Sequence, residues 1–405
     1  MRQISMPWAV ILRTHRHRTP ETAPGTALAA KRATPESSAP SAANRVRTAR
    51  GFAPNAAQKT PVSSARNAAN RGRNDLLEQN VFFKNEKRIK TTVIGCGRWG
   101  SCIAWYLDKI GHDVTLYGRA SSEHMQRILR ERANEYIHFS AGMTFSTDLA
   151  EAAEAELIVI SIGSQALRGL CSELRRYGLQ NKTFVLCMKG IENTTCKRLS
   201  EVLAEELDHP KTAVWLGPGH VEEFYKGIPN CMVIDSADPA LKLALVDAFS
   251  GDIIRFYYGT DLVGNEIGAA AKNVIGIAAG MLDGLQMTSL KGALMSRGTR
   301  EIARLIDACG GSELSAYGLC HLGDYQATVF SPYSHNRRFG EAYIRGESYD
   351  KLAEGYYTVP ALARMAAEKQ VELPICRAVY DVLYEHTDAC LALGRLFERS
   401  QKNEF

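Results

Sequence analysis

Residues 91–119 read TTVIGCGRWGSCIAWYLDKIGHDVTLYGR, and their residue types predict a strand, a tight turn, a helix and a second strand. Before the glycines, residues 89–94 alternate and end in an apolar run. After them, Ile103, Leu107 and Ile110 recur at the spacing of one helix face. This order of elements predicts a strand–helix–strand unit at the start of an α/β domain.

Three glycines fill a G-x-G-x-x-G motif at the predicted turn: Gly95, Gly97 and Gly100. In such a turn the first glycine permits the bend, the second lets a pyrophosphate approach the backbone, and the third lets the helix pack on the strand. The helix N-terminus then presents unpaired N–H groups and a positive dipole end to the phosphates. The motif alone is weak, but its strand and helix context predicts a dinucleotide site.

The length of the chain and the spacing of its cysteines limit the classes to which the protein can belong. Its 405 residues exceed one typical domain and suggest two domains with an appendage. Ten cysteines are scattered singly, without a C-x-x-C pair or a histidine spacing suited to zinc, so we expect reduced thiols, no metal site and a cytoplasmic protein. The longest apolar runs, such as residues 157–162, are far shorter than the roughly 20 residues of a membrane-spanning helix, so we expect no membrane span.

Residues 1–88 differ in composition from the rest. They hold 16 Lys and Arg against 5 Asp and Glu, whereas the remaining residues hold 33 Lys and Arg against 39 Asp and Glu. This basic segment lacks sustained periodicity, so we predict a disordered leader. Two interpretations remain open: a transit peptide for a plastid or another organelle, or translated sequence upstream of the true start. Its few aromatic residues argue against a nucleic-acid-binding arm.

Further buried strands are predicted at residues 157–162, 183–188 and 213–216. Strands that alternate with helices predict a parallel, doubly wound sheet over residues 89–260, with ligands beyond the carboxyl ends of the strands. Lys189 directly follows one of these strands and Gly217 follows another, so both are expected at the ligand-binding edge. A loop lysine is usually solvated, yet this position favours a functional role for Lys189.

Near residue 260, Ala, Gly and long helical patterns replace the strand signals, so we predict a helical domain over residues 261–405. Lys272 is the only cation in residues 264–284, GNEIGAAAKNVIGIAAGMLDG, whose small residues let neighbouring backbone come close. Two interpretations of this lysine are open. Its stem packs while its charge reaches water, or burial lowers its pKa toward the range of general acid–base catalysis.

Polar side chains gather in two short segments, HLGD at residues 321–324 and SHNRRFG at residues 334–340. Hydroxyl, amide and cationic groups in one turn suit a phosphate ester, and paired arginines offer forked donors. The alternative is that Arg337 and Arg338 lie on the surface of a helix. Asp324 is either a helix N-cap or a carboxylate that orients a catalytic lysine.

Taken together, the motifs resemble those of NAD(P)-dependent glycerol-3-phosphate dehydrogenases of the bacterial and plastid type, over roughly three quarters of the chain. In chain order they are GCGRWG at 95–100, MKGIE at 188–192, GPGHVEEFYKGIP at 217–229, AAAKNVIGIAAGMLDG at 269–284, LGD at 322–324, SHNRRFG at 334–340 and EGYYT at 354–358. The resemblance implies a Rossmann-type domain followed by an all-helical domain like that of 6-phosphogluconate dehydrogenase, with the active site in the cleft between them.

The resemblance further implies an oxidoreductase that interconverts sn-glycerol 3-phosphate and dihydroxyacetone phosphate with NADP or NAD. Such an enzyme supplies glycerol 3-phosphate for phospholipid synthesis. The family suggests a homodimer.

The resemblance also implies roles for single residues. Lys272 matches the lysine that exchanges a proton with the C2 oxygen of the substrate, assisted by Lys189 and Asp324. Substrate-contacting positions are Lys189, Gly217, Gly219, Lys272, Asp324, Ser334, His335 and Asn336. Cofactor-contacting positions are Gly95, Gly97, Arg98, Trp99, Gly100, Arg119, Lys189, Val221, His335, Leu352 and Glu354.

Several residues depart from the family pattern. His335 stands where the family usually has an arginine, so a forked cation for phosphate is lost. Gly219 replaces a hydroxyl or amide side chain, and Arg98 replaces a small residue beside the pyrophosphate. We therefore expect either that Arg337 or Arg338 compensates, or that the substrate differs, as in a related hydroxyacid dehydrogenase. A non-catalytic, nucleotide-binding regulator is the remaining alternative.

Arg119 bears on the choice of dinucleotide. The second strand ends in Tyr117-Gly118-Arg119, where Asp or Glu would bind the ribose hydroxyls of NAD. Because no carboxylate repels it there, a 2′-phosphate can pair with the Arg119 guanidinium. The sequence thus predicts that NADPH is accepted, with the alternative that Arg119 stacks on the adenine or points to solvent.

Overall fold

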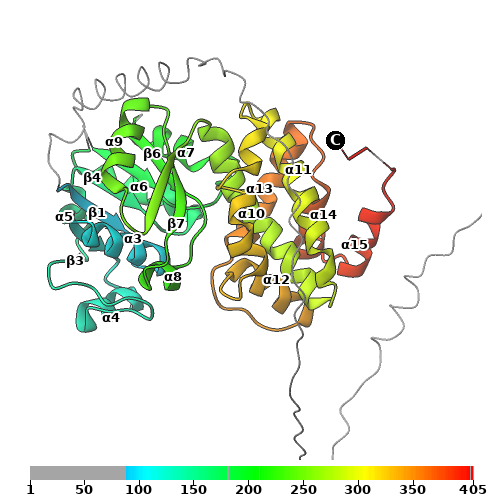
Figure 1. Ribbon diagram of the computed structural model, residues 1–405, viewed down its shortest axis with the longest axis horizontal. Coiled ribbons are helices and arrows are strands. Elements are labelled where there is room, and N and C mark those ends of the chain that lie inside the picture. The colour runs from blue at the N-terminus through cyan, green and yellow to red at the C-terminus, as the bar shows by residue number, and fades with distance from the viewer. Residues whose placement is uncertain (1–87, 180–181, 209, 402, 405) are drawn as a thin grey trace, which may run out of the picture. The chain divides into compact units, whose positions relative to one another are not determined.

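The structure is a computed structural model that describes residues 88–179, 182–208, 210–401 and 403–404. The predicted basic leader, apart from Arg88, lies outside the described residues. The remainder begins with a sheet flanked by helices and continues with helices alone (Figure 1). The last strand ends at Tyr258 and the long helix α10 begins at Leu262, on either side of the boundary predicted near residue 260. That the two parts are separate domains stays a prediction.

Eight strands form one sheet in the order β3-β2-β1-β4-β5-β6-β7-β8. Their bounds are β1 (Lys90–Ile94), β2 (Asp113–Tyr117), β3 (Thr144–Ser146), β4 (Leu157–Ile160), β5 (Thr183–Leu186), β6 (Lys211–Leu216), β7 (Asn230–Asp235) and β8 (Ile254–Tyr258). The order runs outward from β1 in both directions, which is the doubly wound arrangement that the sequence predicts.

The predicted parallel direction holds for the first six strands. However, β7 pairs antiparallel with β6, and β8 runs parallel to β7. The connection from β6 to β7 contains only the five-residue helix α8 (Val221–Tyr225). Parallel neighbours are usually joined by a crossover whose helix runs back along the sheet. This connection has no such helix, and the chain returns beside β6 in the opposite direction.

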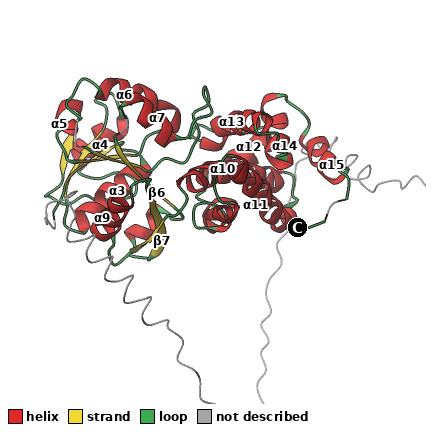
Figure 2. Ribbon diagram, turned by 90° about the horizontal axis from the view of Figure 1, so that it is seen from above, coloured by secondary structure: helices red, strands yellow, loops and turns green. Residues whose placement is uncertain are grey.

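Helices cover both faces of the sheet (Figure 2). They are α3 (Arg98–Lys109), α4 (Glu123–Glu131), α5 (Leu149–Ala153), α6 (Leu167–Leu174), α7 (Leu199–Glu206), α8 and α9 (Pro239–Phe249). Val93 packs in one buried cluster with residues of α3 and α9, and its neighbour Ile94 packs in another with residues of α6 and α7. Consecutive residues of β1 therefore face opposite layers, as the pleat of a strand requires.

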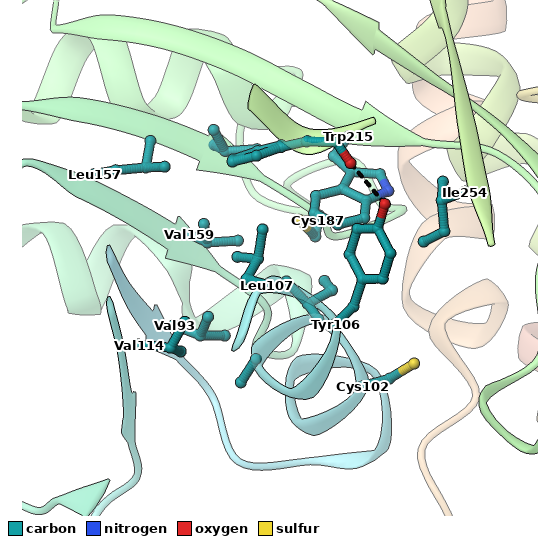
Figure 3. Packing of buried hydrophobic residues seen from close by; sticks show 14 of the residues in the cluster. Val93, Cys102, Tyr106, Leu107, Val114, Leu157, Val159, Cys187, Trp215 and Ile254 are labelled. Carbon is teal, nitrogen blue, oxygen red and sulfur yellow. Dashed lines mark hydrogen bonds between the residues drawn. The ribbon is translucent and has the colours of Figure 1, made fainter. Parts of the chain in front are cut away.

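Large aromatic side chains fill the layer between the sheet and α3 (Figure 3). Trp215 of β6 is fully buried and meets the ring of Tyr106, with 6.0 Å between the ring centroids. The Tyr106 hydroxyl donates a hydrogen bond of 2.6 Å to the carbonyl oxygen of Phe249 at the end of α9. This contact ties α3, which carries the glycine-rich turn at its start, to the rest of the layer.

The second part of the chain is built around α10 (Leu262–Gly284), which is buried over most of its length. Around it lie α11 (Lys291–Ala308), α12 (His335–Arg345), α13 (Glu354–Glu368) and α14 (Pro374–Tyr384), followed by α15 (Ala389–Phe397). A Cβ atom on Gly280 would lie 1.9 Å from the carbonyl oxygen of Arg337. The small residues of α10 thus let α12 approach closely, as predicted. No helix among the described residues is long and apolar enough to cross a membrane.

Glu301 of α11 caps α14 from within the helical core. Its two carboxyl oxygens accept hydrogen bonds from the backbone nitrogens of Ile375 (2.9 Å) and Cys376 (3.0 Å). Burial raises the pKa of Glu301 to about 7. Because the folded pKa lies above the unfolded value of roughly 4.3, the folded state binds the proton more tightly. The stability that this proton contributes is complete at low pH and is lost as the pH rises from about 4 through 7.

Glu301→Gln should remove most of this pH dependence, because glutamine keeps an acceptor oxygen but carries no charge. We expect the difference in unfolding free energy between pH 5 and pH 8 to shrink by on the order of 2 kcal/mol. Urea denaturation at the two pH values measures it. An unchanged difference in the glutamine variant would mean that Glu301 is ionised in the fold throughout this range.

Candidate active site

The glycine-rich turn follows β1 and has the geometry that its three glycines predict. Gly95 has a φ of +121°, and a Cβ atom there would lie 2.1 Å from the carbonyl oxygen of Ser161. A Cβ atom on Gly100 would lie 1.9 Å from the carbonyl oxygen of Gly95. At Gly97, by contrast, a Cβ atom would meet nothing within 4 Å. The first and third glycines allow tight packing, and the second leaves space beside the backbone.

The N-terminus of α3 fits the phosphates of a dinucleotide. Gly97 is its N-cap, and no side chain caps the helix. In the first turn of α3, Arg98 Nε and Trp99 Nε1 are buried and have no hydrogen-bond partner among the described residues, as is also true of Arg132 Nε and His220 Nε2 elsewhere. Since buried polar groups are nearly always paired, unpaired nitrogens at this turn suit a ligand rich in acceptor oxygens. Arg98 and Trp99 are therefore well placed for the predicted cofactor contacts.

Two lysines from different parts of the chain share one buried carboxylate. Asp324 Oδ2 lies 2.7 Å from Lys189 Nζ and 3.0 Å from Lys272 Nζ, and Asp324 is 1% exposed. Lys189 follows β5 and also donates to the carbonyl oxygen of Gly217, at the end of β6, over 2.6 Å. Asp324 thus orients both lysines, which supports the second of its two interpretations.

Lys272 projects from the middle of α10 and is 8% exposed. Its ammonium group donates a hydrogen bond of 2.7 Å to the hydroxyl of Thr328, which in turn donates to the carbonyl oxygen of Asp324. Burial lowers the pKa of Lys272 to about 8, against the opposing influence of the Asp324 charge and with a further lowering by Lys189. The lysine is therefore desolvated and can take up or release a proton near neutral pH.

Amide side chains fix the backbone around the lysines. The Asn273 side chain donates a hydrogen bond of 2.9 Å to the backbone carbonyl oxygen of Lys189 and accepts one of 3.0 Å from the side-chain nitrogen of Asn336. The side-chain oxygen of Asn336 accepts a hydrogen bond of 2.9 Å from the backbone nitrogen of Gly355. The structure thus places Asn336 against Asn273, the neighbour of Lys272, and its contact with the substrate stays a prediction. The sequence analysis missed Asn273, although it directly follows Lys272 in the same motif.

Glu354 joins the helical part to the turn after β4. Its carboxylate accepts from the backbone nitrogen of Ser164 (3.0 Å) and from the Ser164 hydroxyl (2.5 Å). Burial raises the pKa of Glu354. Leu352 is half exposed and lies near Gly163 of the same turn. Both predicted cofactor residues therefore border the carboxyl end of a strand, and Ser164 is the hydrogen-bond partner of Glu354.

The loop after β6 explains one departure from the family pattern. Gly219 has a φ of +157°, and a Cβ atom there would lie 2.2 Å from the ring of Phe224. A hydroxyl or amide side chain at Gly219 does not fit this conformation. Gly217 is also left-handed, with a φ of +127°. Val221 is 2% exposed and belongs to the core of the sheet part.

The start of α12 carries the second departure. The Ser334 hydroxyl caps this helix by accepting from the backbone nitrogen of Arg337 over 3.3 Å. His335 Nδ1 and the Tyr349 hydroxyl share a hydrogen bond of 2.6 Å. Burial, and then the nearby charge of Arg98, lower the pKa of His335 to about 4, so the imidazole is neutral at neutral pH.

The two arginines that follow Asn336 have different surroundings. Arg337 forms ion pairs with Asp283 (2.5 Å) and Glu341 (3.2 Å). Arg338 is exposed, with its guanidinium 5.8 Å from the centre of the Tyr349 ring. These carboxylates neutralise Arg337, so the structure offers no support for compensation by Arg337, and whether either arginine compensates for His335 stays a prediction. Arg338 fits its alternative as a surface residue.

Arg119 lies directly after β2 and is exposed. Its side chain has no ion pair or hydrogen bond within the part of the chain that the structure describes. The preceding Gly118 packs against Cys96, where a Cβ atom would lie 2.5 Å from the sulfur. The guanidinium is thus available to a ligand at the end of β2. Groups of three or more metal-ligating side chains are absent from the described residues.

Comparison with known proteins agrees with this arrangement. Residues 90–242 match the family described as NAD-dependent glycerol-3-phosphate dehydrogenase N-terminus, and residues 261–393 match the corresponding C-terminus. The chain is 38% identical over 318 residues to glycerol-3-phosphate dehydrogenase [NAD(P)+] of Bradyrhizobium sp. (strain ORS 278), a match that covers 77% of this chain and 97% of the relative. It is 34% identical to the enzyme of the same name from Thermoanaerobacter sp. (strain X514), over 78% of this chain and 99% of the relative.

A solved structure, glycerol-3-phosphate dehydrogenase from Coxiella burnetii, superposes with a TM-score of 0.73 at 27% identity and covers 78% of this chain and 100% of its own. The glycine-rich turn and the lysine pair thus lie within segments that both family descriptions match. The chain belongs to the NAD-dependent glycerol-3-phosphate dehydrogenase family.

Proposed function

We propose that the protein interconverts sn-glycerol 3-phosphate and dihydroxyacetone phosphate with NADPH or NADH. The observation that carries this proposal is the buried Lys272–Asp324–Lys189 cluster at the carboxyl end of the sheet. The reduction of a ketone requires a proton donor and a cationic environment for the developing alkoxide. The bound nicotinamide cofactor supplies the hydride, and the cluster offers the proton and the positive charge.

In this proposal Lys272 exchanges the proton with the C2 oxygen of the substrate. In reduction its ammonium group donates the proton, and in oxidation the neutral amine accepts it. Asp324 holds Lys272 and Lys189 through one carboxylate oxygen, so that Lys189 can stabilise charge on the substrate oxygen. Proton transfer through Lys272 agrees with a pKa of about 8.

The remaining substrate groups have chemistry suited to a phosphate ester. The Ser334 hydroxyl and the Asn336 amide both lie at the start of α12, where the helix dipole favours an anion. We assign the substrate contacts to Lys189, Gly217, Gly219, Lys272, Asp324, Ser334, His335 and Asn336. The neutral His335 can only donate or accept a hydrogen bond, so it contributes less to phosphate binding than an arginine would.

For the cofactor we assign the pyrophosphate to the turn formed by Gly95, Gly97 and Gly100 and to the N-terminus of α3. Further contacts are assigned to Arg98, Trp99, Arg119, Lys189, Val221, His335, Leu352 and Glu354. We also propose a homodimer in the cytoplasm, or in an organelle if residues 1–88 are a transit peptide. The glycerol 3-phosphate formed would enter phospholipid synthesis.

The decisive experiment measures oxidation of NADPH and NADH by the full chain with dihydroxyacetone phosphate. Turnover supports the proposal. The neutral His335 favours a second candidate, a hydroxyacid dehydrogenase, for which a 2-keto acid would be reduced in place of the phosphate ester. Tight NADPH binding without turnover of either substrate would instead indicate a non-catalytic regulator.

Arg119→Ala tests the cofactor preference. A charge-assisted pair between Arg119 and the 2′-phosphate contributes about 1.5 to 3 kcal/mol, so the KM for NADPH should rise roughly tenfold or more. The KM for NADH, which lacks this phosphate, should change little. Arg130→Ala, which removes another exposed arginine of the same part of the chain, serves as control. Equal losses for both cofactors would contradict the assignment.

A further inference from the structure

Tyr349 is a half-buried residue in the otherwise exposed segment that connects α12 to α13. Residues 345–348 and 350–352 are all exposed, whereas Tyr349 is not. Its ring packs edge-on against the ring of Phe339, with 6.1 Å between the centroids, and the Arg338 guanidinium lies 5.8 Å from its centre. Two side chains of α12 therefore fix the ring of a tyrosine that the proposed reaction does not yet use.

The Tyr349 hydroxyl binds one ring nitrogen of His335. The two atoms, Tyr349 Oη and His335 Nδ1, are 2.6 Å apart. The other ring nitrogen, His335 Nε2, has no hydrogen bond to a described residue, and it is not among the unpaired nitrogens that the protein covers completely. One edge of the imidazole is therefore bound within the protein, and the other edge stays accessible to a ligand.

Both partners of this hydrogen bond are uncharged at neutral pH. Burial lowers the pKa of His335 to about 4. Three nearby cations add to this lowering and one carboxylate opposes it, namely Arg98, Lys351, Arg338 and Glu222. Burial also raises the pKa of the Tyr349 phenol. The hydrogen bond thus joins a protonated phenol to a neutral imidazole, in which one of the two ring nitrogens carries a proton.

The chemistry of the two groups decides which ring nitrogen carries this proton. A phenol O–H group is a stronger acid than the N–H group of a neutral imidazole, and an unprotonated ring nitrogen is a stronger base than a phenol oxygen. The Tyr349 hydroxyl therefore donates, and His335 Nδ1 accepts. Because the hydrogen bond at one ring nitrogen sets the protonation of the other, Nε2 then bears the proton and presents an N–H donor.

We propose that Tyr349 is a positioning residue that holds His335 in the tautomer with its proton on Nε2, so that this position offers a donor to the ligand. The inference rests on the proposed function, which assigns His335 to the cofactor and substrate contacts. A bare Nε2 would turn a lone pair toward the oxygen atoms of such ligands, and two acceptors cannot form a hydrogen bond with each other. Tyr349 thereby decides whether the contact at His335 is attractive.

Nitrogen-15 NMR of the histidine side chains tests the tautomer in the full chain without any ligand. The chemical shifts of the two ring nitrogens report which one is protonated, and the His335 signals are those that disappear in His335→Gln. We expect a protonated Nε2 and a bare Nδ1 at neutral pH, and a shift of the population toward the other tautomer in Tyr349→Phe. A protonated Nδ1 in the original protein, or unchanged populations in Tyr349→Phe, overturns the proposal.

The consequence for binding is measured by titration of the full chain with NADPH and with NADH, together with the KM for dihydroxyacetone phosphate. Tyr349→Phe should weaken the ligand that His335 contacts by about threefold to tenfold, the contribution of one hydrogen bond. Weaker binding of both cofactors assigns the Nε2 donor to the cofactor, and a change confined to the KM assigns it to the substrate. No change in any of the three values contradicts the inference.

A double variant shows whether Tyr349 acts through His335. In His335→Gln the side-chain amide reaches about as far as Nε2 and donates without help from Tyr349, so this variant should bind more tightly than His335→Ala. Adding Tyr349→Phe to His335→Gln should then cause no further loss. A further loss as large as that of Tyr349→Phe alone would mean that the tyrosine acts independently of the histidine, against the proposal.

Tyr343→Phe is the matched control. It also removes a hydroxyl, which donates a hydrogen bond of 3.0 Å to the carbonyl oxygen of Val382, and its ring also packs on Phe339, with 6.1 Å between the centroids. It should lower the unfolding temperature and leave the His335 tautomer and the three binding values unchanged. The NMR measurement and the cofactor titrations require no turnover, so their outcome is separable from a failure of the proposed reaction.

Discussion

Lys272→Met is expected to lower kcat by at least about a hundredfold, the usual contribution of a general acid–base group, while the Kd for NADPH stays nearly unchanged. Methionine has a similar length and no ionisable group, so it fills the space within α10 without a proton to exchange. The lysine it replaces is 8% exposed and bonds to Asp324 and Thr328. Steady-state kinetics with dihydroxyacetone phosphate and titration with NADPH measure the two quantities.

Lys291→Met is the matched control for this variant. Lys291 is equally buried in the helical part, but it bonds to Asp283 and to the carbonyl oxygen of Val329. Its loss should lower the unfolding temperature and leave kcat within a few-fold of the original. Retention of more than about a tenth of the original kcat in Lys272→Met would contradict a role in proton transfer.

The pH dependence of the unmodified protein gives an independent measure of the same group. With a pKa of about 8, Lys272 is mostly protonated below this pH and mostly neutral above it. The kcat/KM for reduction, which needs the ammonium form, should therefore fall as the pH rises through 8. The kcat/KM for oxidation, which needs the amine, should rise over the same range.

The sequence predicts the elements of the fold well where the pattern is local. The strand, turn and helix at residues 91–119 follow from three glycines and a regular apolar spacing, and each glycine has the packing that its position in the motif predicts. The direction of β7 is different. It depends on the connection that leads from β6 to β7, which the residue types in the strand itself do not reveal.

In the candidate site, too, single residues could be predicted from local patterns, whereas their contacts with distant residues could not. Lys272 was equally compatible with a solvated and a desolvated lysine, because the sequence does not show which helices surround α10. The structure places it under Asp324, 52 positions further along the chain. The pairing of Arg98 with Glu222 joins residues 124 positions apart, and no periodic pattern indicates such a contact. The resemblance supplies the candidate residues, and the fold supplies their partners.

Asp324→Asn is expected both to destabilise the protein and to remove most of its activity. The carboxylate is 1% exposed and lies within 3.0 Å of two lysine ammonium groups. Removal of one partner of a buried ion pair costs about 3 to 5 kcal/mol, and we expect the lower end because the side chain of Lys189 is 19% exposed. Thermal and urea unfolding measure this loss.

The loss of activity in Asp324→Asn should arise in part from a change in the pKa of Lys272. The charge of Asp324 opposes the lowering of this pKa by burial and by Lys189, so the pKa should drop further in Asp324→Asn. The pH at which reduction declines should move downward, in addition to a fall in kcat of about a hundredfold or more. A loss of stability alone would leave that pH unchanged.

Asp235→Asn separates the two effects. Asp235 is also 1% exposed and pairs with Lys242 at 3.1 Å and with Asn265 at 2.8 Å, but it touches neither Lys189 nor Lys272. It should therefore destabilise the protein to a similar degree and keep the kcat and pH profile of the folded fraction. If Asp235→Asn and Asp324→Asn gave the same kinetic profile, Asp324 would serve only the stability of the fold, and the lysine pair would not depend on it for its charge.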